Sequence, residues 1–186
     1  TENAIMAASL AKGQTRIFNA AKEPEVTDLI RCLNKMGAKI EGEETDQLII
    51  DGVKELKPTN FSVMPDRIEI ATYLTAAVMT GGEITVKAIN PNSLDKVIQK
   101  LELAGAEISK ADDLINLKMT KTPLSVNIST APYPFFPTDM QAQFIAMNSI
   151  AQGKSEVIEN VFENRFMHVQ ELTRMGGKIE LKGNTA

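Results

Sequence analysis

The feature that most constrains this chain is an internal repeat of roughly 70 residues. Three alanine-rich helical stretches each end in a glycine, at intervals of 68 and 72 residues; these glycines are Gly13, Gly81 and Gly153. A second, amphipathic helix in each copy also ends in glycine, at intervals of 68 and 71 residues, and these glycines are Gly37, Gly105 and Gly176. Two separate sets of landmarks therefore indicate the same period.

Strand predictions repeat with the same spacing. A β-branched run follows each first glycine, over residues 15–18, 84–86 and 157–158. Further strands are predicted over 48–50 and 61–63, and one period later over 114–117 and 125–128. The unit is thus β-α-β-α-β-β. Each of its two helices has one apolar face, and a single copy of the unit cannot cover both faces. We therefore expect tandem copies of a mixed α/β (α+β) fold, with the helices packed inward against outer sheets.

Composition excludes several function classes. The 186 residues carry 20 Lys+Arg against 24 Asp+Glu, and a net charge of −4 disfavours nucleic acid as a partner. One cysteine and one histidine leave no basis for a disulfide framework or a common zinc motif, and no nucleotide-binding fingerprint is present. No apolar stretch is long enough for a membrane span. We expect no metal, no cofactor, no membrane association and a cytoplasmic location.

An unusual loop precedes one acidic residue. Residues 131–137 contain three prolines and three aromatic side chains, and Asp139 follows two residues after the last proline. A stiff apolar wall of this kind suits a binding cleft, where a carboxylate accepts a proton from a substrate hydroxyl. The structural alternative is a capping box between Thr138 and Gln141, with Asp139 placed to favour the start of a helix.

Other candidates have plain structural interpretations. The charged loops 22–25 and 161–165 occupy matching positions after the middle strands, and such loops are either solvated or places where ligands collect. Cys32 lies near an apolar stripe, which favours packing over reactivity. His168 has no partner histidine or cysteine for metal binding and is interpreted as structural or as a helix cap.

Several long motifs resemble one enzyme family. They are residues 19–25, 65–69, 131–134, 136–144 and 161–169, and together they resemble UDP-N-acetylglucosamine 1-carboxyvinyltransferases over essentially the whole chain. The resemblance implies transfer of the enolpyruvyl group from phosphoenolpyruvate to the 3′-hydroxyl of UDP-N-acetylglucosamine. This is the committed step of peptidoglycan synthesis, which links the enzyme to cell wall biogenesis, cell shape, cell division and the cell cycle.

The resemblance also implies an architecture. The family fold is an inside-out α/β barrel, with six repeats in two domains and the substrates in the cleft between them. Residues 1–64 then correspond to one repeat of the domain that carries the reactive loop, and residues 65–186 to two repeats of the other. The chain is expected to be an internal piece of a longer protein. Its partners would be the remainder of the same chain or a second copy of the fragment.

Site residues follow from matching the motifs position by position. Asp139 matches the aspartate that contacts the sugar 3′-hydroxyl and is proposed as its base, Val161 matches a substrate contact made through its backbone, and Phe162 is adjacent. The charged positions that match the rim of the cleft are Arg165, Arg67, Glu23 and Glu25. The family's reactive cysteine or aspartate matches nothing here, so the fragment alone is expected to be nearly inactive. Two alternatives remain, an enolpyruvylshikimate-phosphate synthase-like enzyme and a non-catalytic repeat module.

Overall fold

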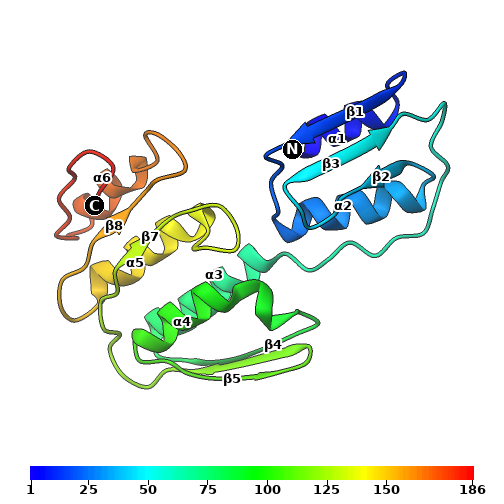
Figure 1. The fold of residues 1–186 in the computed structure, drawn as a ribbon. Coiled ribbons are helices and arrows are strands. Elements are labelled where there is room, and N and C mark those ends of the chain that lie inside the picture. Colours follow the sequence, from blue (N-terminus) through cyan, green and yellow to red (C-terminus); the bar gives the residue numbers. More distant parts are fainter. The chain divides into compact units, whose positions relative to one another are not determined.

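The computed structural model describes residues 1–186, which divide into two compact units, Thr1–Met64 and Pro65–Ala186 (Figure 1). In the first unit, a three-stranded antiparallel sheet of order β1-β3-β2 packs against two helices. The assignment of the two units to different domains of a longer enzyme stays a prediction. The elements of the first unit are α1 (Glu2–Ser9), β1 (Gln14–Phe18), α2 (Pro24–Lys35), β2 (Lys39–Glu41) and β3 (Gln47–Asp51).

The second unit begins with the same arrangement. Its sheet has the order β4-β6-β5, and α3 and α4 lie together on one side of it (Figure 1). A parallel pair, β7-β8, and two further helices complete the unit. Its elements are α3 (Arg67–Thr80), β4 (Glu83–Lys87), the 3₁₀ helix η1 (Pro91–Leu94), α4 (Asp95–Leu103), β5 (Glu107–Ala111), β6 (Leu114–Lys118), β7 (Ile128–Ser129), the 3₁₀ helix η2 (Thr138–Met140), α5 (Gln141–Ile150), β8 (Val157–Ile158) and α6 (Met167–Arg174).

Repeated helix endings produce this repeated geometry. After α2, the Gly37 N–H donates to the Asn34 carbonyl and the Ala38 N–H donates to the Leu33 carbonyl. This bonding pattern needs a left-handed residue, and Gly37 has a φ of +100°. The same pair of hydrogen bonds closes α4 at Gly105 and α6 at Gly176. Each glycine therefore turns the chain out of its helix in the same direction, which explains the periodic spacing in the sequence.

Four local predictions were wrong. Residues 61–63 form no strand, and Val63 is exposed. Of the segment 125–128, only its last residue lies in a strand, because the Asn148 side-chain amide bonds both the N–H and the carbonyl of Val126 and takes the place of a neighbouring strand. The helices expected to end at Gly13 and Gly153 stop earlier, whereas Gly81 caps α3 directly with a φ of +69°.

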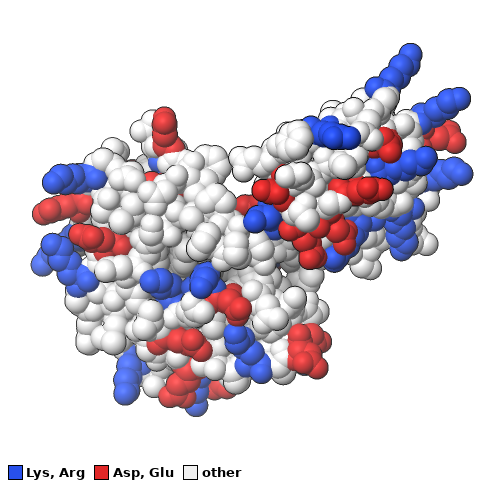
Figure 2. Space-filling view, in the orientation of Figure 1, with Lys and Arg blue, Asp and Glu red and all other residues white.

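Two features bear on partners. No helix in the structure combines the length and the apolar character needed to cross a membrane. On the face shown in Figure 2, Lys and Arg side chains are interspersed with Asp and Glu side chains instead of forming a continuous basic area. The part of the surface in this view therefore lacks the continuous basic track that favours binding of a polyanion.

The core of the second unit centres on α3 and α5. Leu74 and Val78 of α3 are fully buried, and they share one hydrophobic cluster with Phe144 of α5. The Phe144 ring meets the Phe136 ring edge-on at 5.0 Å between centroids. Phe136 belongs to the proline-rich loop, so this contact attaches the loop to the core two residues before η2 begins.

We expect Leu74→Ala to lower the free energy of unfolding by about 3 kcal/mol, because it leaves a cavity where the side chain is 0% exposed. The neighbouring residue Tyr73 is 57% exposed on the same helix, and Tyr73→Ala should change stability by less than about 1 kcal/mol. Urea unfolding followed by circular dichroism measures both. Equal losses in the two variants would contradict this description of the core.

Candidate functional site

The structure brings four of the predicted site residues together. The Arg165 Nη2 donates to the Asp139 Oδ1 at 2.8 Å, and the Arg165 guanidinium lies 5.1 Å from the centre of the Phe162 ring. Asp139 lies on η2, whereas Val161, Phe162 and Arg165 follow β8 in the segment that leads to α6. The Asp139 side chain is 53% exposed and the Phe162 ring is also exposed, so a ligand can reach both.

A buried carboxylate holds this segment in place. Glu159 is 3% exposed, and its Oε1 accepts the N–H of Val161 at 2.8 Å and the N–H of Phe162 at 3.1 Å. The same oxygen accepts the Thr130 hydroxyl at 2.8 Å. The other oxygen, Oε2, accepts the Thr138 hydroxyl, also at 2.8 Å. Four donors therefore surround one side chain that has almost no contact with solvent.

Thr138 connects this carboxylate to the ion pair. Its hydroxyl donates to Glu159 and accepts the Arg165 Nη1 at 2.8 Å, and one hydroxyl group can do both. The predicted capping box with Gln141 is therefore wrong, since no side chain caps η2 or α5 and the Thr138 hydroxyl is engaged elsewhere. A capping Thr oxygen accepts a backbone N–H, whereas the Thr138 oxygen accepts the charged Arg165 guanidinium while its O–H donates to Glu159.

Opposing effects act on Glu159. Burial is the largest, and it raises the pKa because it disfavours the charged form. The hydrogen bonds from Phe162, Thr138, Val161 and Thr130 favour the charged form, and together they bring the pKa of Glu159 below its ordinary value. The stabilisation from these bonds is therefore complete above the ordinary pKa of a glutamate and is lost as the pH falls through the pKa of the folded state.

Sequence reasoning missed Glu159, although a signal for it exists. Side chains alternate along a strand, so Glu159 falls on the same face as Val157, which is buried. A carboxylate at an interior position needs several donors. The sequence shows that Glu159 occupies an interior position. Its four donors come from three separate segments, which only the fold brings together.

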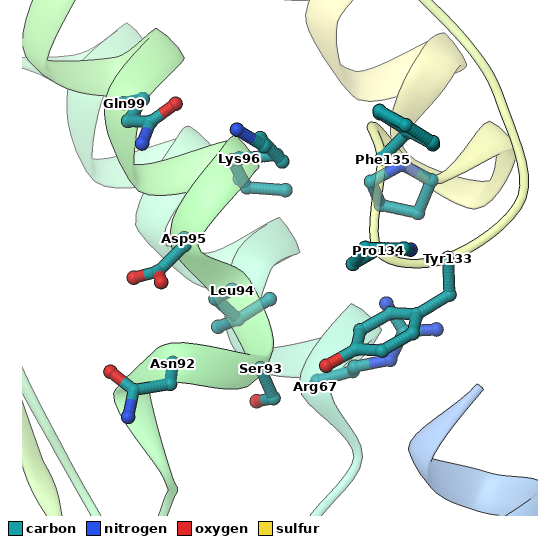
Figure 3. A pocket seen from close by; sticks show the side chains of 12 residues that line it. Arg67, Asn92, Ser93, Leu94, Asp95, Lys96, Gln99, Tyr133, Pro134 and Phe135 are labelled. Carbon is teal, nitrogen blue, oxygen red and sulfur yellow. The ribbon is translucent and has the colours of Figure 1, made fainter. Parts of the chain in front are cut away.

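Arg67 lies elsewhere in the same unit. It begins α3, is 5% exposed, and its guanidinium lies 5.6 Å from the centre of the Tyr133 ring. Both residues line a pocket of about 260 Å³ between the start of α4 and the proline-rich loop, and Figure 3 shows the Tyr133 ring alongside Arg67. Pro137 also lines this pocket, whereas Asp139 and Arg165 do not.

The remaining predicted residues belong to the first unit. Glu23 immediately precedes α2, and Glu25 lies in the first turn of that helix. Cys32 is half-buried on α2, outside the set of fully buried core residues. Glu23 and Glu25 stay predictions as site residues.

His168 lies beside the site on α6. Its Nε2 is buried and has no hydrogen-bond partner. Burial lowers the pKa of His168, and the positive charge of Arg165 lowers it further. The unfolded chain therefore binds a proton more readily than the folded chain. Folding stability contributed by neutral His168 is present above its ordinary pKa and declines as the pH falls from that value to the pKa of the folded state.

His168 is the only histidine, so its titration can be followed by NMR without ambiguity. We expect a pKa below the ordinary 6.5, and a shift back toward that value in Arg165→Gln because one positive charge is removed. Arg174→Gln is the control, since Arg174 lies on the same helix and pairs with Glu171 at the surface. An Arg165→Gln titration identical to that of the unmodified chain would contradict the arrangement described here.

Comparisons with known proteins place this geometry in context. The fold resembles that of the enolpyruvyl transferase NikO from Streptomyces tendae, with a TM-score of 0.83 and 24% identity, over 98% of this chain and 44% of that one. EPSP synthase from Acinetobacter baumannii aligns with a TM-score of 0.49 and 16% identity, over 99% of this chain and 43% of that one. The chain thus spans less than half the length of either protein.

The likeness to NikO confirms the expected mixed α/β class and the enolpyruvyl transferase fold. The family model for EPSP synthase (3-phosphoshikimate 1-carboxyvinyltransferase) matches residues 1–186, which is the whole sequence. The chain therefore belongs to the EPSP synthase (3-phosphoshikimate 1-carboxyvinyltransferase) family of enolpyruvyl transferases.

Proposed function

We propose that this chain is part of an enolpyruvyl transferase that uses phosphoenolpyruvate and UDP-N-acetylglucosamine. In the reaction, the sugar 3′-oxygen bonds to C2 of the enolpyruvyl group, the bond from C2 to the phosphate oxygen breaks, and phosphate leaves. The observation that carries the proposal is the cluster of Asp139, Arg165 and Phe162, which two separate motifs of the sequence contribute. In the cytoplasm, this reaction would serve peptidoglycan synthesis and thus cell shape and division.

Asp139 is proposed to receive the hydroxyl proton. An acceptor for this proton must lie within hydrogen-bonding distance of the sugar hydroxyl. The Asp139 carboxylate is held by Arg165 through Oδ1 while more than half of the side chain remains exposed. Its orientation is thus restrained without its being covered, and an approaching hydroxyl would meet a carboxylate already in position.

Val161 and Phe162 are proposed to contact the nucleotide sugar. Both N–H groups already donate to Glu159, so a backbone contact from Val161 falls to its carbonyl oxygen. The Phe162 ring is 56% exposed, and it offers an apolar face next to the Arg165 guanidinium. An apolar surface beside a few fixed polar groups is typical of small-molecule sites. In this proposal Arg67, Glu23 and Glu25 are further substrate-binding residues.

A second candidate is an enzyme that acts on 3-phosphoshikimate. The family match favours it, because the family model is that of EPSP synthase. The two candidates differ in the acceptor alone, so the acceptor that supports phosphate release distinguishes them. The segments 138–144 and 161–169, which resemble the nucleotide-sugar enzymes, are the reason to place UDP-N-acetylglucosamine first.

In the complete enzyme, we expect Asp139→Asn to lower kcat by about 100- to 10,000-fold, because the amide cannot take up the hydroxyl proton. Asp112→Asn is the matched control, since Asp112 is exposed in the turn between β5 and β6. Phosphate release with phosphoenolpyruvate and UDP-N-acetylglucosamine is the measurement. Turnover with 3-phosphoshikimate in place of the nucleotide sugar would overturn the proposed acceptor.

Residues 1–186 alone should release no phosphate, because the resemblance places the reactive loop outside this sequence. Calorimetry then tests for a partial acceptor site. We expect binding of UDP-N-acetylglucosamine that is lost in Asp139→Ala and retained in Asp112→Ala. A folded chain that binds no sugar nucleotide would instead favour the non-catalytic repeat module, and phosphate release dependent on both substrates would contradict the expected inactivity.

A further inference from the structure

Two parts of the candidate site meet at one buried side chain. The Oε1 of Glu159 accepts both backbone N–H groups of the Val161–Phe162 segment. Its Oε2 accepts the Thr138 hydroxyl, which in turn accepts the guanidinium that binds Asp139. We infer that Glu159 is the positioning residue of this site, and that it sets the Asp139–Arg165 pair through Thr138. This role in catalysis rests on the proposed function.

The path from Glu159 to Asp139 is continuous. Three successive contacts, from Glu159 to Thr138, from Thr138 to Arg165 and from Arg165 to Asp139, each measure 2.8 Å. Arg165 uses Nη1 for the hydroxyl and Nη2 for the carboxylate. A guanidinium group is planar and rigid, so fixing one nitrogen fixes the direction of the other. The orientation of the Asp139 carboxylate therefore depends on where the Thr138 hydroxyl lies.

The contacts require a carboxylate and not merely a polar group. Glu159 is the acceptor in all four of its hydrogen bonds, and an ionised carboxylate can only accept. In Glu159→Gln, the amide oxygen would retain the three donors on one side, and the amide NH₂ would face Thr138. The Thr138 hydroxyl would then face donors from both the amide NH₂ and Arg165, which disturbs its contact with Arg165. The hydrogen bonds from the Val161 and Phe162 N–H groups are largely kept.

Thr138 gives an independent way to interrupt the same path. Thr138→Val preserves the shape of the side chain and removes the hydroxyl, so Arg165 loses its Nη1 partner while Asp139 remains. Thr138→Ser keeps the hydroxyl and should restore the path. Glu156→Gln is the matched control for Glu159, because Glu156 precedes β8 by one residue and is exposed.

Kinetics of the complete enzyme test the role. We expect Glu159→Gln and Thr138→Val each to lower kcat about 10- to 100-fold, with less than about a threefold change in the KM for UDP-N-acetylglucosamine. The double variant should be no slower than the slower single variant, because both changes interrupt one path. Thr138→Ser should recover most of the activity that Thr138→Val loses, and Glu156→Gln should retain full activity. Wild-type kcat in folded Glu159→Gln, or losses that multiply in the double variant, would overturn the inference.

A measurement independent of activity separates this inference from the proposed function. The amide protons of Val161 and Phe162 bond a carboxylate, and such charge-assisted bonds are shorter and stronger than neutral ones. In NMR spectra of the folded chain, we expect both amide protons to move upfield in Glu159→Gln and to stay in place in Glu156→Gln. Unchanged shifts would overturn the inference. If these shifts move but the enzyme cannot use UDP-N-acetylglucosamine, the proposed substrate is wrong, whereas the hydrogen bonds by which Glu159 holds the Val161–Phe162 segment are confirmed.

Discussion

The candidate site depends on burying one carboxylate among four donors. Leaving an ionised group in the interior is costly unless its oxygens are hydrogen-bonded, and Glu159 meets this condition by drawing together the β8 segment, Thr130 and η2. Because those donors come from separate parts of the sequence, the arrangement exists only when the unit is folded. The exposed Asp139 and Phe162 are thereby attached to a rigid interior.

The repeated fold supplies the positions for these segments. Each second helix ends at a left-handed glycine with the same two hydrogen bonds, so each copy redirects the chain alike. In the last copy, the loop of residues 131–137 is attached to α5 through Phe136 and Phe144. A loop with one end packed in the core places η2, and with it Asp139, more reproducibly than a free loop would.

Sequence reasoning predicted the parts that depend on local rules. The strands over 48–50 and 114–117 follow from periodicity. The ends of α2, α4 and α6 follow from the conformational freedom of the glycine after each helix. Sequence reasoning failed where a residue distant in the sequence forms a competing hydrogen bond. Asn148 bonds both backbone groups of Val126 and shortens a predicted strand, and the Arg165 guanidinium donates to the Thr138 oxygen that the capping box required as an acceptor. Neither competitor is near its target in the sequence.

The sequence by itself determined the repeat, the mixed α/β class and the motifs that resemble an enolpyruvyl transferase, because each depends on neighbouring residues and on spacing. Only the tertiary structure decided that Asp139 pairs with Arg165, that Arg165 lies over Phe162, and that Glu159 holds both segments. The contacts of Arg165 with Asp139 and of Glu159 with Thr138 join residues more than 20 positions apart, and the other contacts lie within the segment that follows β8. Their geometry follows from the packing of these segments around a shared core.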